Sequence, residues 1–250
     1  MKRKVLIAGG DSWTDPGYSA HAHPDMDCSW PRWPELLAEK LDMDCINLGF
    51  IGAGNKHIYT SLVDQIQIMD PNDIGLIIPA WSQSQRIDIK VRDIWKNVDT
   101  PPQNPSYSVH DIAKYGDITH RVEESIMLYY SLQEICKSKN IPLCQVQMIP
   151  IFMGYNWNLI TLQRDEPDST NTETLLRTIF NSIYVDMIDD TFVGWPTESE
   201  LSGFNIQMSV LGGERGDLND HRMEHVISEY DDHPNAKGQI KIMEFLYEKI

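Results

Sequence analysis

Three short polar clusters in this chain carry side chains that are typical of acyl-transfer chemistry. Gly9–Ser12 ends an apolar run and presents a hydroxyl, which becomes a nucleophile when a general base reaches it. Ser82–Gln83 also follows an apolar run and offers an amide donor. Asp231–His233 sets an imidazole, the usual general base near neutral pH, beside two carboxylates. Each cluster alone also fits a turn or a helix cap, so their combination is what indicates a site.

The elements that must position these clusters follow from the apolar pattern. Continuous apolar runs predict buried strands at residues 4–8, 44–48, 73–81 and 141–149, with a short strand or a turn at 192–196. Amphipathic stretches predict helices at residues 33–41, 56–69, 117–139, 173–188 and 236–248. This alternation indicates a parallel sheet with helices on both faces. Since the carboxyl ends of parallel strands share one edge, we expect the three clusters to converge there.

A glycine-rich loop follows the second predicted strand and supplies a fourth cluster. Gly49, Gly52 and Gly54 precede a helix, where exposed backbone N–H groups suit an anion or an oxyanion. The alternative interpretation is close packing of strand against helix. The spacing does not match a dinucleotide-binding fingerprint, and no carboxylate ends the next strand. A nucleotide site is therefore disfavoured.

Length and charge narrow the function classes. The chain has 250 residues, which predicts one domain over 1–250, with insertions at about 87–116 and 150–171. Its net charge of −16 disfavours nucleic acid and anionic membranes as partners. No apolar run has the length of a membrane span and no signal peptide is evident, so a cytoplasmic location is the default expectation.

Cysteines and scattered histidines are the other residue types in this chain that could bind a metal. The four cysteines form no CxxC pair, which predicts reduced thiols rather than a zinc site. His21 and His23 lie in a polar loop, and His221 and His225 lie four residues apart. Solvated faces explain both pairs more simply than metal binding. We expect no metal and no organic cofactor.

Taken in order, Gly10–Ser12, the Gly52 loop and His233–Asn235 resemble the motifs of SGNH (GDSL-type) hydrolases. The forms at residues 47–52 and 81–86 look closer to divergent members from bacteria and bacteriophages, so a viral origin is one expectation. The resemblance implies a three-layer α/β/α sandwich with a mainly parallel, flavodoxin-like sheet. It also implies that Ser12 is nucleophile and backbone oxyanion donor, that Gly52 is a second donor, and that His233 is the base.

Two departures from the family pattern affect the site. Gln83 stands where the family has an asparagine that donates to the oxyanion. Tyr230 stands three residues before His233, where the family has aspartate, so Asp231 is the expected orienting acid and Asp232 the alternative. Asp11 and Asn55 complete the predicted site, as residues that support the catalytic groups or are alternatives to them.

These features predict a serine esterase acting on small esters, with O-acetyl groups on a carbohydrate as one substrate class. Four aromatic residues in the insertions would then form a sugar-facing wall: Trp95, Tyr107, Tyr155 and Trp157. The alternative is a catalytically weak or inactive protein of the same fold that binds carbohydrate or protein in a phage or polysaccharide system.

Overall fold

The central sheet of the protein is parallel throughout. The computed structural model describes residues 2–20, 22–99, 118–152, 157–158, 163–164, 169–213 and 220–250. The strand order is β2-β1-β3-β6-β9, and every neighbouring pair is parallel. These strands are β1 (Val5–Gly9), β2 (Asp44–Asn47), β3 (Ile74–Trp81), β6 (Gln145–Gln147) and β9 (Phe192–Val193). The order is that of flavodoxin-like folds, so the predicted fold class is confirmed.

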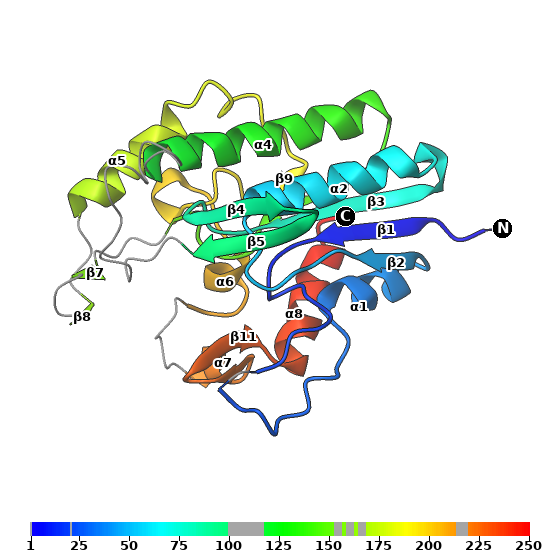
Figure 1. Ribbon diagram of the computed structural model, residues 1–250, viewed down its shortest axis with the longest axis horizontal. Helices are drawn as coiled ribbons and strands as arrows, with labels where there is room; N and C mark the ends of the chain where they lie inside the picture. Colours follow the sequence, from blue (N-terminus) through cyan, green and yellow to red (C-terminus); the bar gives the residue numbers. More distant parts are fainter. Residues whose placement is uncertain are drawn as a thin grey trace.

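Helices cover both faces of this sheet (Figure 1). Helices α1 (Trp33–Lys40) and α8 (Ala236–Tyr247) pack on one face. Helices α2 (Asn55–Ile68), α4 (Ile118–Ser138) and α5 (Ser169–Phe180) pack on the other. Successive residues of a strand point to opposite faces, so Leu6 belongs to the first core and Ile7 to the second. Burial on both faces is the reason that β1 and β3 read as unbroken apolar runs.

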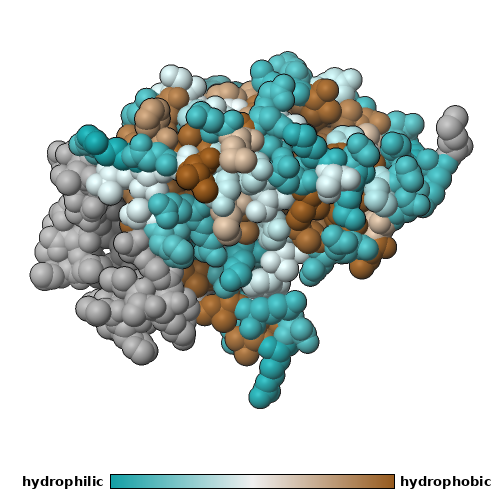
Figure 2. Space-filling model, turned by 90° about the horizontal axis from the view of Figure 1, so that it is seen from above, coloured by the Kyte–Doolittle hydropathy of each residue, from teal (hydrophilic) through white to brown (hydrophobic). Residues whose placement is uncertain are grey.

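Shorter elements complete the described chain. They are η1 (Pro71–Asp73), β4 (Arg86–Val91), β5 (Ile94–Asp99), β7 (Trp157–Asn158), β8 (Gln163–Arg164), η2 (Ser199–Leu201), α6 (Ile206–Ser209), α7 (Asp220–Met223), β10 (Val226–Ser228) and β11 (Asp231–Pro234). None of the helices within the described ranges combines the length and the hydropathy needed to cross a membrane. Figure 2 shows polar side chains interspersed with small apolar areas on one face of the molecule.

One predicted helix extends too far. The pattern predicts a helix over residues 173–188, but α5 ends at Phe180. Ser182 follows almost directly, and its Oγ accepts the backbone N–H of Tyr184 at 3.3 Å. Such a local side-chain bond gives the backbone an alternative to helical pairing. Residues 181–188 therefore form turns, although their apolar residues continue the helical spacing.

The first predicted insertion begins with a β-hairpin, which the sequence analysis missed. Strands β4 and β5 pair antiparallel, and the two turn residues, Arg92 and Asp93, both have positive φ, at 49° and 65°. Two-residue hairpin loops favour this conformation. The signal was present in the alternation of Ile87, Ile89 and Val91 with polar residues. Most of the second predicted insertion, at 150–171, lies outside the described residues.

The hairpin supplies the cap at the start of α2. Asp88 on β4 accepts the Gly54 N–H at 2.9 Å and the His57 N–H at 2.8 Å. Gly54, the residue at the N-cap position, has no side chain to do this. The hairpin also packs on the helix, because the Trp95 ring stacks on His57 with centroids 4.7 Å apart. Asp88 therefore fixes the start of α2 and the glycine loop that precedes it.

We expect Asp88→Ala to lower the free energy of unfolding by about 1–2 kcal/mol, since two helix N–H groups lose their acceptor. Urea denaturation measures the change. Glu39→Ala, which removes an exposed carboxylate on α1, is the matched control and should change stability by less than about 0.5 kcal/mol. Equal stabilities for the two variants would contradict a capping role.

Candidate active site

The structure brings Ser12, His233 and Asp231 into one line of hydrogen bonds. Ser12 lies in the turn that follows β1, and the other two residues lie on β11. The Ser12 Oγ is 2.7 Å from His233 Nε2, and His233 Nδ1 is 2.6 Å from Asp231 Oδ1. Ser12 and Asp231 are each 6% exposed, whereas the His233 side chain between them is partly exposed.

The D-x-H spacing follows from the local backbone. Asp231–Pro234 is a strand paired antiparallel with β10, and not the turn or helix cap that this cluster also fits by sequence. In a strand, residues two apart point to the same side, so Asp231 and His233 face Ser12 together. Asp232 lies between them in the strand, and its Oδ2 lies 3.5 Å from Arg222 Nη2. The geometry thus favours Asp231 over Asp232 as the partner of His233.

Tyr18 is a third neighbour of this pair that the sequence analysis did not single out. Its hydroxyl lies 2.8 Å from Asp231 Oδ2 and 2.8 Å from His233 Nδ1. Its ring stacks on the imidazole, with centroids 4.1 Å apart. No periodicity marks Tyr18, which stands in a polar loop 213 residues before Asp231. Only the folded structure shows the contact.

The same contacts shift the acidity of Asp231. Burial works to raise the pKa of Asp231, but the hydrogen bonds from His233 and Tyr18 and the charge of His233 outweigh it and hold the pKa below its usual range. Burial, with the hydrogen bond to Asp231, raises the pKa of the Tyr18 phenol far above its usual range. Tyr18 is therefore a protonated donor and Asp231 a charged acceptor at neutral pH.

The lowered pKa makes the stability contribution of Asp231 depend on pH. Its folded-state pKa lies below the unfolded value of about 4, so the contribution is present above about pH 4 and is lost as pH falls through the folded pKa. We expect the stability difference between wild type and Asp231→Asn to narrow as pH falls below about 4. Urea unfolding across this range tests it. Asp25→Asn, at an exposed carboxylate, is the control; a difference that stays constant would contradict the assignment.

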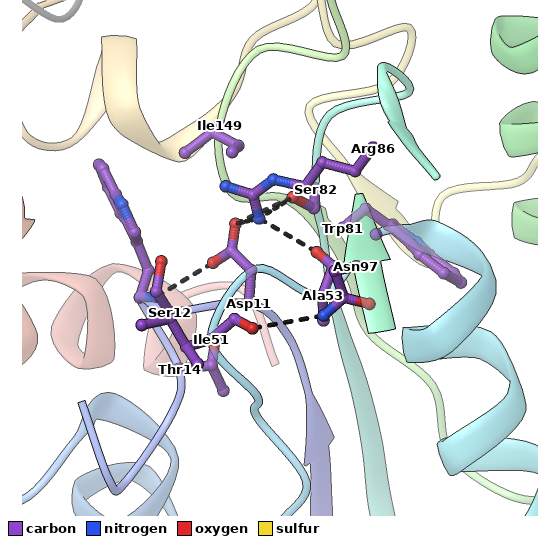
Figure 3. Close-up of polar contacts among 12 residues, drawn as sticks. Asp11, Ser12, Thr14, Ile51, Ala53, Trp81, Ser82, Arg86, Asn97 and Ile149 are labelled. Carbon is purple, nitrogen blue, oxygen red and sulfur yellow. Dashed lines mark hydrogen bonds and ion pairs between the residues drawn. The ribbon is translucent and has the colours of Figure 1, made fainter. Parts of the chain in front are cut away.

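Asp11 stabilises the serine turn through buried polar contacts. It is fully buried; its Oδ1 accepts the Trp13 N–H at 3.0 Å, and its Oδ2 accepts the Ser82 hydroxyl at 2.9 Å. Arg86 Nη1 forms an ion pair with the same Oδ2 at 2.8 Å and donates to the Ala53 carbonyl at 3.1 Å (Figure 3). Arg86 therefore links the loops that follow β1, β2 and β3, a role the sequence analysis did not predict.

Glycine is required where two of these loops meet. A side chain on Gly10 would place its Cβ 2.2 Å from Thr14 Oγ1. A side chain on Gly49 would lie 2.6 Å from the Thr14 backbone carbon. The Asp11 carbonyl meanwhile accepts the N–H groups of Thr14 and Asp15 at 2.9 and 3.0 Å. The serine turn is thus tightly wound and packed directly against the loop after β2.

That loop carries Gly52, the expected oxyanion donor. Gly52 has a φ of +75°, a conformation that favours glycine. The preceding residue is fixed on both sides: the Ile51 N–H bonds Asp15 Oδ2 at 2.8 Å, and the Ile51 carbonyl accepts from Asn97 Nδ2 at 3.3 Å (Figure 3). The hairpin therefore holds the backbone around Gly52 in a defined conformation.

Of the two expected amides, Asn55 is committed to the interior. Its Nδ2 donates to Ser125 Oγ at 3.0 Å and to Tyr129 Oη at 3.2 Å, and its Oδ1 accepts the Ser82 N–H at 2.8 Å. Asn55 thus braces the turn that follows β3. Gln83 is the next residue in that turn and is partly exposed. Gln83 therefore stays the candidate side-chain donor, and Asn55 is a support.

The remaining candidate metal ligands have protein partners. Among the described residues, Asp231, Asp232 and His233 have ligand atoms within 4.8 Å of one another. Tyr18 and Arg222 already contact the two carboxylates, and a nearby guanidinium opposes a further cation. These contacts favour a hydrogen-bonding role over a metal site.

Three of the other histidines that the structure describes have partners away from Ser12. His23 Nε2 bonds Ser228 Oγ at 2.7 Å, and His225 Nδ1 bonds the His221 carbonyl at 2.6 Å. His221 Nε2 lies 2.9 Å from Lys241 Nζ. His21 lies outside the described residues. The structure thus pairs neither His23 nor His225 with Ser12.

No family model matches the chain, and no curated protein matches it either. Solved structures similar to it include a candidate lipolytic protein of the G-D-S-L family from Desulfitobacterium hafniense (12% identity, 99% of each chain, TM-score 0.48). A psychrotrophic esterase from a Pseudoalteromonas species is 12% identical over 98% of this chain and 96% of the esterase (TM-score 0.43). An acetyl xylan esterase from Geobacillus stearothermophilus is 12% identical over 99% and 94% (TM-score 0.41). At these identities, the reaction must be argued from the site itself.

Proposed function

We propose that the protein is a serine hydrolase of carboxylic esters in which Ser12, His233 and Asp231 act as a triad. The observation that carries the proposal is the unbroken chain of contacts, 2.7 Å from Ser12 to His233 and 2.6 Å from His233 to Asp231. A hydroxyl paired with an imidazole that is itself oriented by a carboxylate is the arrangement that activates serine.

The proposed mechanism has two halves. His233 Nε2 takes the proton of Ser12 as Oγ attacks the ester carbonyl, and Asp231 stabilises the imidazolium that forms. The tetrahedral intermediate then expels the alcohol, which takes the proton from His233. Water, deprotonated by the same nitrogen, attacks the acyl-enzyme; the acid then leaves as Ser12 Oγ takes the proton back from His233. Every proton in the cycle passes through His233, and no metal or organic cofactor takes part.

The proposed oxyanion donors are the backbone N–H groups of Ser12 and Gly52 and the side-chain amide of Gln83. The winding of the serine turn and the fixed loop around Gly52 support the first two. The partial exposure of Gln83, next to the Ser82 hydroxyl that bonds Asp11, supports the third. Fixed donors of this kind stabilise the charge that develops in the transition state.

The substrate class we propose is a small ester, including O-acetyl groups on a carbohydrate. The partly exposed Trp95 is the one residue of the expected aromatic wall whose surroundings the structure describes, and it is stacked on His57. Tyr107 and Tyr155 lie outside the described residues. The wall at the insertions therefore stays a prediction that rests on the sequence.

Hydrolysis of p-nitrophenyl acetate by purified protein tests the proposed reaction. We expect Ser12→Ala and His233→Ala each to lower kcat by at least about a thousandfold, because the two residues act as one unit. Ser138→Ala, at an exposed serine on α4, is the matched control and should keep full activity. An aryl phosphonate should label wild type and the control but not Ser12→Ala.

Full hydrolysis by Ser12→Ala would overturn the proposed mechanism. A folded wild type that neither hydrolyses esters nor reacts with the phosphonate would instead favour the alternative, a protein of this fold that binds carbohydrate or protein without catalysis. A glycan-binding measurement on Ser12→Ala would then follow.

We expect Gln83→Ala to lower kcat by about a hundredfold with little change in KM, because an oxyanion donor acts mainly in the transition state. Steady-state kinetics with p-nitrophenyl acetate measure both constants. Gln67→Ala, which removes an exposed amide on α2, is the control. A kcat for Gln83→Ala equal to that of the control would remove Gln83 from the oxyanion site.

A further inference from the structure

We propose that Tyr18 is a positioning residue that holds Asp231 and, through it, sets the proton-accepting form of His233. The proposal rests on the proposed function and adds to the triad a fourth side chain that touches no substrate. Tyr18 is 7% exposed and comes from the loop between β1 and α1, so it reaches the triad from the side of the serine turn.

The proton count around Asp231 decides the direction of each hydrogen bond. The Tyr18 hydroxyl lies 2.8 Å from Asp231 Oδ2, 3.0 Å from Asp231 Oδ1 and 2.8 Å from His233 Nδ1, but it has one proton to donate. A phenol that donated to Nδ1 would leave the proton of a neutral His233 on Nε2, which could not then accept from Ser12. Donation to the charged carboxylate is also the stronger bond.

With the phenol directed to Oδ2, Asp231 Oδ1 is left for the Nδ1–H of His233 at 2.6 Å. That arrangement places the lone pair of Nε2 toward Ser12 Oγ, 2.7 Å away. Tyr18 thus occupies the second oxygen of a buried carboxylate and prevents it from rotating. The bond fixes the tautomer in which His233 can act as base.

The Tyr18 ring adds a second constraint on the imidazole. Its plane is inclined by 24° to that of His233, with centroids 4.1 Å apart, so the histidine ring has little room to turn. The loop that carries Tyr18 is itself anchored by buried Arg32. Arg32 Nη2 donates to the Tyr18 carbonyl at 2.9 Å, and Arg32 Nε donates to the Asp15 carbonyl at 3.1 Å.

The other charged and titratable groups near the Tyr18 phenol are the same in wild type and in the Tyr18→Phe variant. Asp232 and Cys28 both act on Tyr18 electrostatically, and Arg222 lies beside Asp232 at 3.5 Å. Tyr18→Phe removes only the hydroxyl and keeps the stacked ring. A change in the pH profile of that variant therefore reports the lost bond to Asp231.

The test combines Tyr18→Phe with a second background. We expect Tyr18→Phe to lower kcat for p-nitrophenyl acetate by about tenfold with KM nearly unchanged. The acidic limb of the kcat/KM profile should move to higher pH, because Asp231 without its second donor stabilises the imidazolium more strongly. In an Asp231→Ala background, the same change should alter kcat by less than about twofold. Tyr130→Phe, at a partly buried tyrosine on α4, is the control.

Equal losses in both backgrounds with an unmoved pH profile would show that Tyr18 serves packing only, and would overturn the proposal. ¹⁵N NMR of the His233 ring separates this failure from failure of the proposed function, because it needs no turnover. We expect the Nδ1–H tautomer in wild type and a raised pKa of His233 in Tyr18→Phe. A His233 ring that titrates identically in the two proteins would overturn the proposal whether or not esters are hydrolysed.

Discussion

The candidate site depends on one buried ion pair. Asp11 lies directly before the serine, is fully buried, and has Arg86 at 2.8 Å as its cationic partner. A buried carboxylate without such a partner costs several kcal/mol, so the loops that supply its donors are held where they are. Because Arg86 also bonds the carbonyl of Ala53, the ends of β1, β2 and β3 share this constraint. The Asp11–Arg86 ion pair therefore fixes the positions of the serine turn and of the glycine loop.

The layout of the fold was predictable because its signal is local. Strands β1 and β3 are buried on two faces and so read as apolar runs, and the covering helices repeat their apolar residues at helical spacing. The proposed site residues Ser12, Asp231 and His233 were likewise selected from their types, their order and the resemblance that they carry. The structure adds the distances, and it places Asp232 with Arg222 instead of with the histidine.

What the sequence did not predict depends on contacts between distant residues. Tyr18 and Arg86 have side chains common in any loop, and nothing in their neighbours marks them as partners of Asp231 and Asp11. The capping of α2 by Asp88, which lies on another element, is of the same kind. The residues Gly54 and Asn55 at the start of α2 do not indicate which side chain accepts the first N–H groups of the helix. The prediction of a helix beyond residue 180 was wrong for a different reason. There the side chain of Ser182 bonds the local backbone although the apolar pattern continues.

The Ser12–His233 contact joins residues that are 221 positions apart in the chain. A ribosome adds residues in order, so a nascent polypeptide contains Ser12 long before it contains Asp231 and His233. Contacts of such long sequence separation form late and slowly. In the proposed mechanism Ser12 has no base until β11 has docked, so the onset of ester hydrolysis would report that docking, whereas helical content would not.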